Sequence, residues 1–175
     1  LGDAFLAGFT VIPRVTEENI YNIVDQQRDA ADFLFYDLPG VGARLITYAL
    51  ARSQFVVVPM QASEPDMSCA VRSAKQIDDA GRMNTPSRVI ARRYIWTRIP
   101  AAIVSKGLLH AEKLAEELKL PLFDTRVVDR AAMRDMFFTG IPPHLGPDGR
   151  PVDTNAALNA RALATSRLAI ADSTP

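Results

Sequence analysis

Short apolar runs alternate along the chain with longer segments in which apolar residues recur every three or four positions. The short runs are rich in β-branched and aromatic residues, and they lie at Phe9–Ile12, Phe33–Tyr36, Phe55–Val58, Val89–Trp96 and Leu122–Phe123. Several of them are apolar throughout instead of at alternate positions, which is typical of strands covered on both faces. The pattern therefore predicts a mostly parallel sheet with helices on both of its faces.

The longer segments have the periodicity of amphipathic helices. Thr16 is placed to cap a first helix, and Asp66 is placed to cap a second one that runs to Ala80. A third helix is expected over residues 104–118, with small and apolar residues on one face and charged residues on the other. Strands and helices in alternation predict an α/β fold, whose ligands bind at the carboxyl ends of the strands.

The expected organisation is a single α/β domain over residues 1–175. A loop rich in Pro and Gly is expected at residues 141–153, followed by a helix rich in Ala and Leu at residues 154–171. Asp153 or Thr154 is placed to cap that helix. A chain of 175 residues can bury a core without a disulfide or a structural zinc, and its single cysteine could supply neither.

The balance of charges narrows the class of partners that the protein can be expected to bind. The chain carries 20 Lys and Arg against 20 Asp and Glu, and this balance argues against a histone-like polyanion binder. Only four of the basic residues are lysines.

No apolar run is long enough for a membrane span, and the first residues lack a signal-peptide pattern, so we expect a cytoplasmic protein with no membrane partner.

One carboxylate is placed for metal chemistry. Asp37 directly follows the run Phe33–Tyr36, which is the position of a Walker B carboxylate that holds Mg²⁺ or its water at a sheet edge. Pro39 and Gly40 then turn the chain so that a backbone N–H can face a phosphate. The alternative is that Asp37 caps the next helix and that the glycine only makes a tight turn.

Several motifs in order resemble the ParA/MinD family of deviant-Walker P-loop ATPases. They begin with Asp37-Leu38-Pro39-Gly40 and continue with the strand end and turn at residues 58–66. Trp96-Thr97-Arg98 is similar to the strand end that lines the nucleotide base in that family, and residues 120–127 resemble its following strand. The segment from Thr139 to Pro142 resembles the Gly-x-Pro motif that follows the next helix in that family. The resemblance spans about residues 33–164.

The resemblance implies roles for individual residues. It implies Mg²⁺ and ATP as cofactors in a homodimer, with Asp37 as the catalytic residue that also holds Mg²⁺ through water. The residues implied to contact the nucleotide are Pro39, Gly40, Thr97, Arg98, Val127 and Asp129. The family's acidic residue near the start of the next helix is replaced around Ala131–Arg134, which leaves contacts from that helix open.

One family element is not found in this sequence. The phosphate-binding loop carries Gly-Lys-Ser/Thr, and none of the four lysines follows a glycine. The expectation is a P-loop NTPase-like fold without its N-terminal strand, loop and helix, which we expect to lie upstream of Leu1. The chain as given is therefore not expected to hydrolyse ATP, because the loop supplies much of the positioning and charge neutralisation.

The expected function is that of a ParA-like ATPase in plasmid or chromosome partitioning. The resemblance implies nonspecific DNA as a scaffold and a ParB-like protein as a stimulating partner. Candidate DNA-binding residues are Arg92, Arg126, Arg130 and Arg134, with scattered solvated charges as the alternative. Other hypotheses are an accessory ATPase of conjugative DNA transfer, a non-catalytic interaction module with a degenerate nucleotide site, and a dethiobiotin-synthetase-like ligase.

Overall fold

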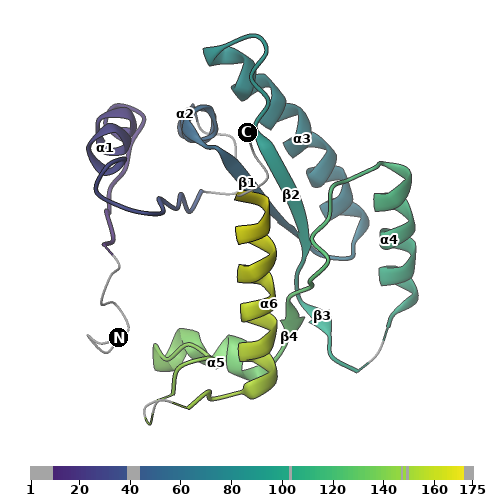
Figure 1. Ribbon diagram of the computed structural model, residues 1–175. Coiled ribbons are helices and arrows are strands. Elements are labelled where there is room, and N and C mark those ends of the chain that lie inside the picture. The colour runs from purple at the N-terminus through teal and green to yellow at the C-terminus, as the bar shows by residue number, and fades with distance from the viewer. Residues whose placement is uncertain (1–9, 39–43, 103, 147, 149, 172–175) are drawn as a thin grey trace. The chain divides into compact units, whose positions relative to one another are not determined.

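A computed structural model of the chain describes residues 10–38, 44–102, 104–146, 148 and 150–171, and these contain a mixed set of helices and short strands. The elements are α1 (Ile20–Gln27), α2 (Arg44–Arg52), β1 (Phe55–Met60), α3 (Glu64–Asn84), β2 (Ala91–Trp96), β3 (Ile99–Pro100), α4 (Lys106–Glu117), β4 (Val128–Asp129), α5 (Ala131–Thr139) and α6 (Thr154–Ala171) (Figure 1).

The chain divides into two compact units, which we describe separately. The N-terminal unit consists of Val11–Val56 and Val71–Arg92, except for the part of it that is not described. The C-terminal unit contains Val57–Ala70 and the described part of Arg93–Pro175. The expectation of a single domain over residues 1–175 stays a prediction.

The strands pair in two short sheets within the described residues. β1 pairs with β2, and β3 pairs with β4 in parallel, with Ile99 opposite Val128. The expected strands at Phe55–Val58 and Val89–Trp96 are confirmed as β1 and β2. The expected strand at Leu122–Phe123 is reduced to a single parallel bridge between Leu122 and Tyr94.

The predicted strand at Phe33–Tyr36 is wrong, because these residues have no regular secondary structure. Leu34 and Tyr36 pack against the core of the N-terminal unit, whereas Phe33 and Phe35 are 56% and 64% exposed. One set of alternating side chains is thus partly buried and the other is exposed, so the run is not covered on both faces. Residues 10–12 of the predicted strand at Phe9–Ile12 also have no regular structure, and Phe9 lies outside the described residues.

The core of the C-terminal unit lies between its strands and the helices beside them. Tyr94 on β2 is fully buried, and its hydroxyl donates a hydrogen bond to the carbonyl of Ala70 at 3.2 Å. The other buried residues of this cluster are Met60, Met67, Ala70, Trp96, Ile99, Leu108, Ala111 and Ala115. The apolar stripe predicted for residues 104–118 therefore buries its central turns, while its ends at Val104 and Leu118 stay exposed.

The N-terminal unit has a smaller core between α1 and α2. Ile20 and Val24 of α1 pack with Ala49 of α2. Arg88 donates hydrogen bonds to the carbonyls of Ala51 and, at 2.7 Å, Ser53, which ties the segment after α3 to the end of α2. These bonds satisfy carbonyls that the end of a helix leaves without intrahelical partners.

Side chains at the helix starts differ in part from the expected caps. α3 is capped by Ser63 rather than by Asp66: the Ser63 hydroxyl accepts from the Asp66 N–H at 3.2 Å and donates to the Asp66 carboxylate. α1 starts at Ile20, after Asn19 instead of directly after Thr16. For α6, the Asp153 carboxylate accepts from the Ala156 N–H at 3.0 Å, which makes Asp153 the cap.

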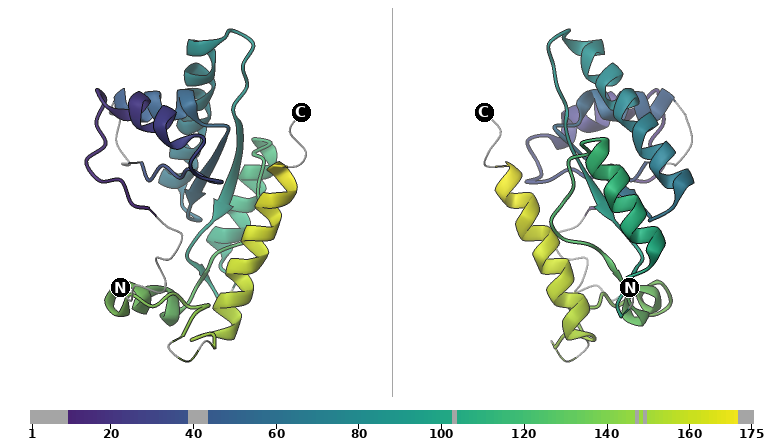
Figure 2. Two further views of the ribbon diagram at one scale, coloured as in Figure 1. Left: turned by 60° about the vertical axis from the view of Figure 1, so that its left-hand side comes forward. Right: turned by 90° about the vertical axis from the view of Figure 1, so that its right-hand side faces the viewer.

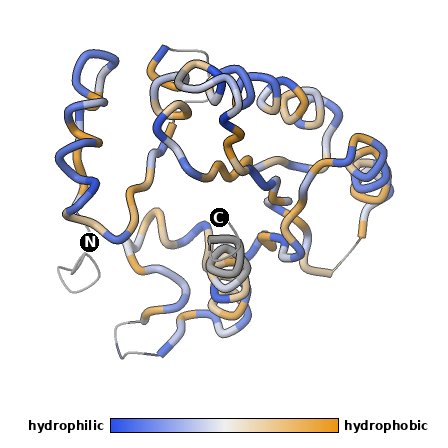
Figure 3. The backbone as a smooth tube through the Cα atoms, turned by 45° about the horizontal axis from the view of Figure 1, so that its top comes forward, coloured by the Kyte–Doolittle hydropathy of each residue, from blue (hydrophilic) through white to orange (hydrophobic). Residues whose placement is uncertain are grey.

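The helices have mixed polar and apolar surfaces, as Figure 3 shows by the alternation of hydrophilic and hydrophobic positions along the tube. None of the helices in the part of the chain that the structure describes has the length and apolar character needed to span a bilayer.

The end of α4 has a strained residue in a regular capping motif. Lys119 has a φ of 52°, in the left-handed region that favours glycine. Its N–H donates to the Glu116 carbonyl, and the Leu120 N–H donates to the Ala115 carbonyl, each at 2.9 Å. These two bonds form a Schellman motif, in which the left-handed position is usually glycine.

We expect Lys119→Gly to raise the free energy of unfolding by about 0.5–1 kcal/mol, because glycine adopts this conformation without steric cost. Lys113→Gly, in the middle of the same helix, is the matched control and should lower it by about 1 kcal/mol. Urea denaturation of the variants measures both changes. Destabilisation by both substitutions to the same extent would contradict the strain at Lys119.

Candidate functional site

The carboxyl end of β2 and the segment that leads into β4 form one continuous edge in the C-terminal unit. The Phe123 N–H donates to the Tyr94 carbonyl at 2.9 Å, and the Val127 N–H donates to the Trp96 carbonyl at 2.8 Å. The Ile99 N–H then donates to the Val127 carbonyl at 3.2 Å. We call residues 97–98 and 127–130 the strand-end edge, since these hydrogen bonds bring them side by side.

Thr97 and Arg98 form the first half of the strand-end edge. Thr97 is fixed by two bonds to the Met60 carbonyl, from its N–H at 2.9 Å and from its hydroxyl at 3.2 Å. Arg98 is exposed and has a φ of 55°, a left-handed conformation that is costly for a residue with a Cβ. No hydrogen bond or ion pair joins its guanidinium group to another described residue, so this cation is available to a ligand.

Val127 and Asp129 lie in the second half, which α6 holds in place (Figure 2). The Asn159 side chain of α6 donates to the Arg126 carbonyl at 2.5 Å and accepts from the Val128 N–H at 3.1 Å. Asp129 is exposed, and its carboxylate pairs with Arg134 at 2.5 Å. The strand-end edge therefore contains Thr97, Arg98, Val127 and Asp129, four of the six residues expected to contact a nucleotide.

The four arginines proposed for DNA binding differ in their partners. Arg126 pairs with Glu112 and Arg134 with Asp129, each at 2.5 Å. Arg92, which lies in the N-terminal unit, pairs with Asp78 at 2.5 Å. Arg130 forms no ion pair with a described residue, and its Nε is buried without a hydrogen-bond partner. Among these four, Arg130 is the arginine without a carboxylate partner among the described residues.

Asp37 lies in the N-terminal unit, on the segment that does not form a strand. Its side chain is exposed, and no hydrogen bond or ion pair joins it to another described residue. Burial raises the pKa of the neighbouring Tyr36 above its ordinary value, although Arg52 and Arg28 oppose the rise. Pro39 and Gly40 lie outside the described residues.

A magnesium site built from side chains alone is not found among the described residues, where no three His, Cys, Asp or Glu side chains are close enough to hold a metal ion. Mg²⁺ commonly binds through one or two carboxylates together with phosphate oxygens and waters. The exposed carboxylate of Asp37 fits this kind of site, in which a nucleotide supplies most of the ligands.

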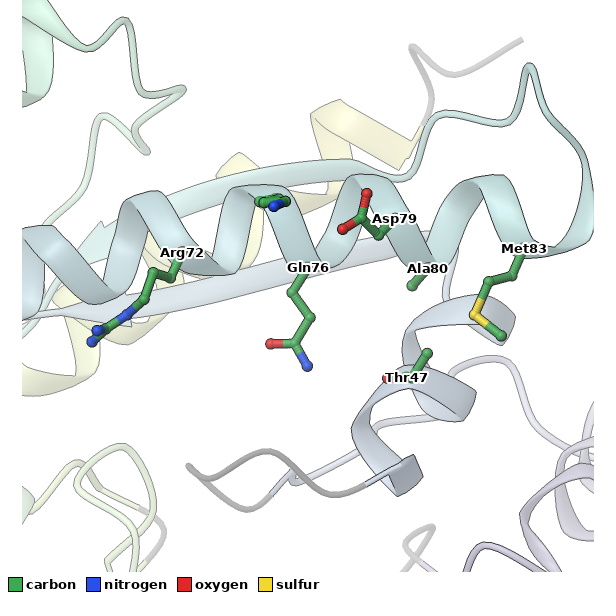
Figure 4. Close-up of a pocket in the computed structure, with 7 residues that line it drawn as sticks. Thr47, Arg72, Gln76, Asp79, Ala80 and Met83 are labelled. Atoms are coloured by element: carbon green, nitrogen blue, oxygen red, sulfur yellow. The ribbon is translucent and has the colours of Figure 1, made fainter.

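A shallow groove of about 410 Å³ lies elsewhere, on α3 in the N-terminal unit, beside α2 (Figure 4). It is lined by Thr47, Arg72, Lys75, Gln76, Asp79, Ala80 and Met83. None of the residues predicted for nucleotide, metal or DNA binding lines it. The candidate site is therefore defined by chain placement and charge, not by a deep pocket.

Asn159 is a site residue that the sequence analysis missed. It lies on α6 next to residues of the buried face, where Ala156 and Ala157 are almost fully buried. An amide side chain near the buried face of a helix needs hydrogen-bond partners. An asparagine at this position of an Ala-rich helix is therefore the sequence feature that could have identified Asn159. Its partners, 31 and 33 positions away, could not be deduced from the sequence.

Comparison with known proteins gives one distant likeness. Over 131 residues, the chain is 24% identical to Protein ParA of Rhizobium radiobacter. The match covers 75% of this chain and 58% of that protein, so the chain spans little more than half the length of this curated relative. No protein-family model matches the chain. The likeness suggests a ParA-like relationship, in agreement with the motifs described above.

The left-handed Arg98 gives a prediction about strain at the strand-end edge. Arg98→Gly should raise the free energy of unfolding by about 1 kcal/mol, because glycine removes the clash of the Cβ. Arg98→Ala removes the same guanidinium group but keeps the Cβ, and should leave stability nearly unchanged. Thermal or urea unfolding of both variants measures the difference, and an Arg98→Gly protein less stable than Arg98→Ala would exclude strain at this position.

Proposed function

We propose that the protein is a ParA-like ATPase with a P-loop NTPase-like fold, which acts in the partitioning of plasmid or chromosomal DNA. In this proposal ATP binding drives dimerisation, and the dimer binds DNA without sequence preference. The phosphate-binding loop is expected upstream of Leu1. The distant likeness to Protein ParA and the order of the motifs support the assignment.

The observation that carries the proposal is the convergence of residues at the strand-end edge. Thr97 and Arg98 follow β2, and Val127 and Asp129 belong to a segment more than 25 positions later, yet backbone hydrogen bonds hold these segments together. Ligands of parallel α/β sheets bind at the carboxyl ends of strands. The exposed guanidinium group of Arg98 would give this edge a cation beside the bound nucleotide.

Asp37 is the residue proposed to hold Mg²⁺, through a water molecule. Bound Mg²⁺ would neutralise charge on the phosphates during hydrolysis. The carboxylate of Asp37 is exposed and has no partner among the described residues, so it is available for this role. It would position the water shell that the metal and the phosphates share.

A non-catalytic interaction module is the second candidate. The observation that favours it is the irregular structure of residues 33–38, since a Walker B carboxylate normally follows a strand. The two candidates differ in ATP turnover, which only the first one predicts. Turnover therefore decides between them.

The test of the first candidate uses the protein with the coding sequence upstream of Leu1. Asp37→Ala should lower ATP turnover in the presence of nonspecific duplex DNA by about 100-fold or more, the scale of losing one preorganised electrostatic group at a reaction centre. Asp32→Ala, an exposed aspartate of the same segment, is the matched control and should keep turnover. Equal turnover of the Asp37→Ala variant and the wild type would remove Asp37 from the mechanism, and no turnover in the wild type would favour the interaction module.

DNA binding is expected to depend on Arg130, because its charge is not neutralised by a described carboxylate. Arg130→Ala should weaken binding to duplexes of unrelated sequence to a similar degree and reduce the slope of log affinity against log salt by about 1. Arg28→Ala is the control, since Arg28 is exposed and pairs with Asp25 at 3.6 Å. Fluorescence anisotropy over a salt series measures the slopes, and equal slopes for the Arg130→Ala and Arg28→Ala variants would rule out a specific role of Arg130.

A further inference from the structure

We infer that Asn159 is the positioning residue of the nucleotide site, because it holds the segment Val127–Asp129 in its binding conformation before a ligand arrives. This inference rests on the proposed function. It adds a residue from α6 to the strand-end edge, whose other residues lie at positions 97–98 and 127–130.

Asn159 is bound to the backbone on both sides of Val127. Its amide nitrogen donates to the carbonyl before Val127, that of Arg126, at 2.5 Å. Its amide oxygen accepts from the N–H after Val127, that of Val128, at 3.1 Å. One side chain thus pairs with a carbonyl and an N–H that face the same side of the segment.

The opposite side of this segment is held by the neighbouring strand backbone. The N–H and the carbonyl of Val127 bond to Trp96 and Ile99, at 2.8 and 3.2 Å. In an extended chain the N–H and the carbonyl of one residue face one side, and those of its two neighbours face the other. The Arg126 carbonyl and the Val128 N–H therefore face away from β2 and β3. Asn159 occupies the place where the next strand of a sheet would bind.

Asparagine has the chemistry that this position requires. Its side chain offers a donor and an acceptor in one plane, as a peptide group does. Aspartate would keep the acceptor for the Val128 N–H but lose the donor to the Arg126 carbonyl. Alanine would lose both, and both exposed edge groups would have to bind water instead.

Preorganisation connects this contact to ligand affinity. A segment that is already ordered loses little conformational freedom on binding, so affinity increases without new ligand contacts. Asn159 does not reach the reacting phosphate in this scheme, which depends on Asp37 and the upstream loop. The expected effect is therefore on nucleotide affinity and not on the rate of the chemical step.

The experiment compares Asn159→Ala, Asn159→Asp and wild type in the protein with its upstream coding sequence. Asn159→Ala should bind ATP about tenfold more weakly and raise KM to match, with kcat within about twofold of the wild type, given the usual strength of two neutral hydrogen bonds. Asn159→Asp should give a smaller loss of affinity. Hydrogen exchange of the Val128 amide should accelerate in Asn159→Ala and less so in Asn159→Asp.

Asn155→Ala is the matched control, because Asn155 is an exposed asparagine one turn earlier on α6, and it should leave KM, kcat and the exchange rate unchanged. A purely structural role would lower kcat through loss of folded protein and leave KM unchanged. If wild type binds ATP and Asn159→Ala binds it equally well, this inference fails alone. If wild type binds no ATP, the proposed function fails, and the nucleotide role of Asn159 fails with it.

Discussion

The pairing of backbone groups along β2 is the constraint on which the C-terminal unit depends. Buried N–H and carbonyl groups need hydrogen-bond partners, and the segment from Pro121 to Val127 supplies them although it contains no strand of its own. It bonds to β2 at Tyr94 and Trp96, whose side chains are buried in the core. The same pairing continues into β4 and so positions Asp129 and the adjoining Arg130.

Charge pairing is a second level of organisation on this backbone. The chain has equal numbers of basic and acidic residues, and the arginines near β4 differ in what they contact. Arg126 and Arg134 are partly neutralised by carboxylates, whereas Arg98 and Arg130 have no ion-pair partner among the described residues. The chain thus has a net charge of zero and also two arginines beside one short strand pair, with Arg98 before β3 and Arg130 after β4. Surface ion pairs add little stability, so the arrangement matters mainly for what these arginines can bind.

The sequence predicted the long periodic elements well, because periodicity over many residues reflects burial of one face. α3 and α4 were found in this way, whereas β1 and β2 were found as short apolar runs. The resemblance to ParA/MinD proteins singled out Thr97, Arg98, Val127 and Asp129, which the structure places at one edge. Their contact with a nucleotide stays a prediction. The strand predicted at Phe33–Tyr36 is wrong, because an apolar run does not show whether a partner strand lies beside it. The ion pair of Arg126 with Glu112 and the contact of Asn159 with Arg126 join distant positions, which local patterns cannot reveal.

The short helix α5 has a further consequence for this edge. It has no buried residue, and Phe137 and Phe138 at its end are 80% and 90% exposed. A helix of nine residues is too short to be stable by itself, and the αL cap at Gly140 and the local hydrogen bonds add only modest support. Its opening therefore costs little free energy and need not disturb the buried strands, so α5 belongs to the elements that unfold locally first. Arg130 lies at the junction between β4 and this weakly held helix, so local opening of α5 changes the surroundings of its buried Nε.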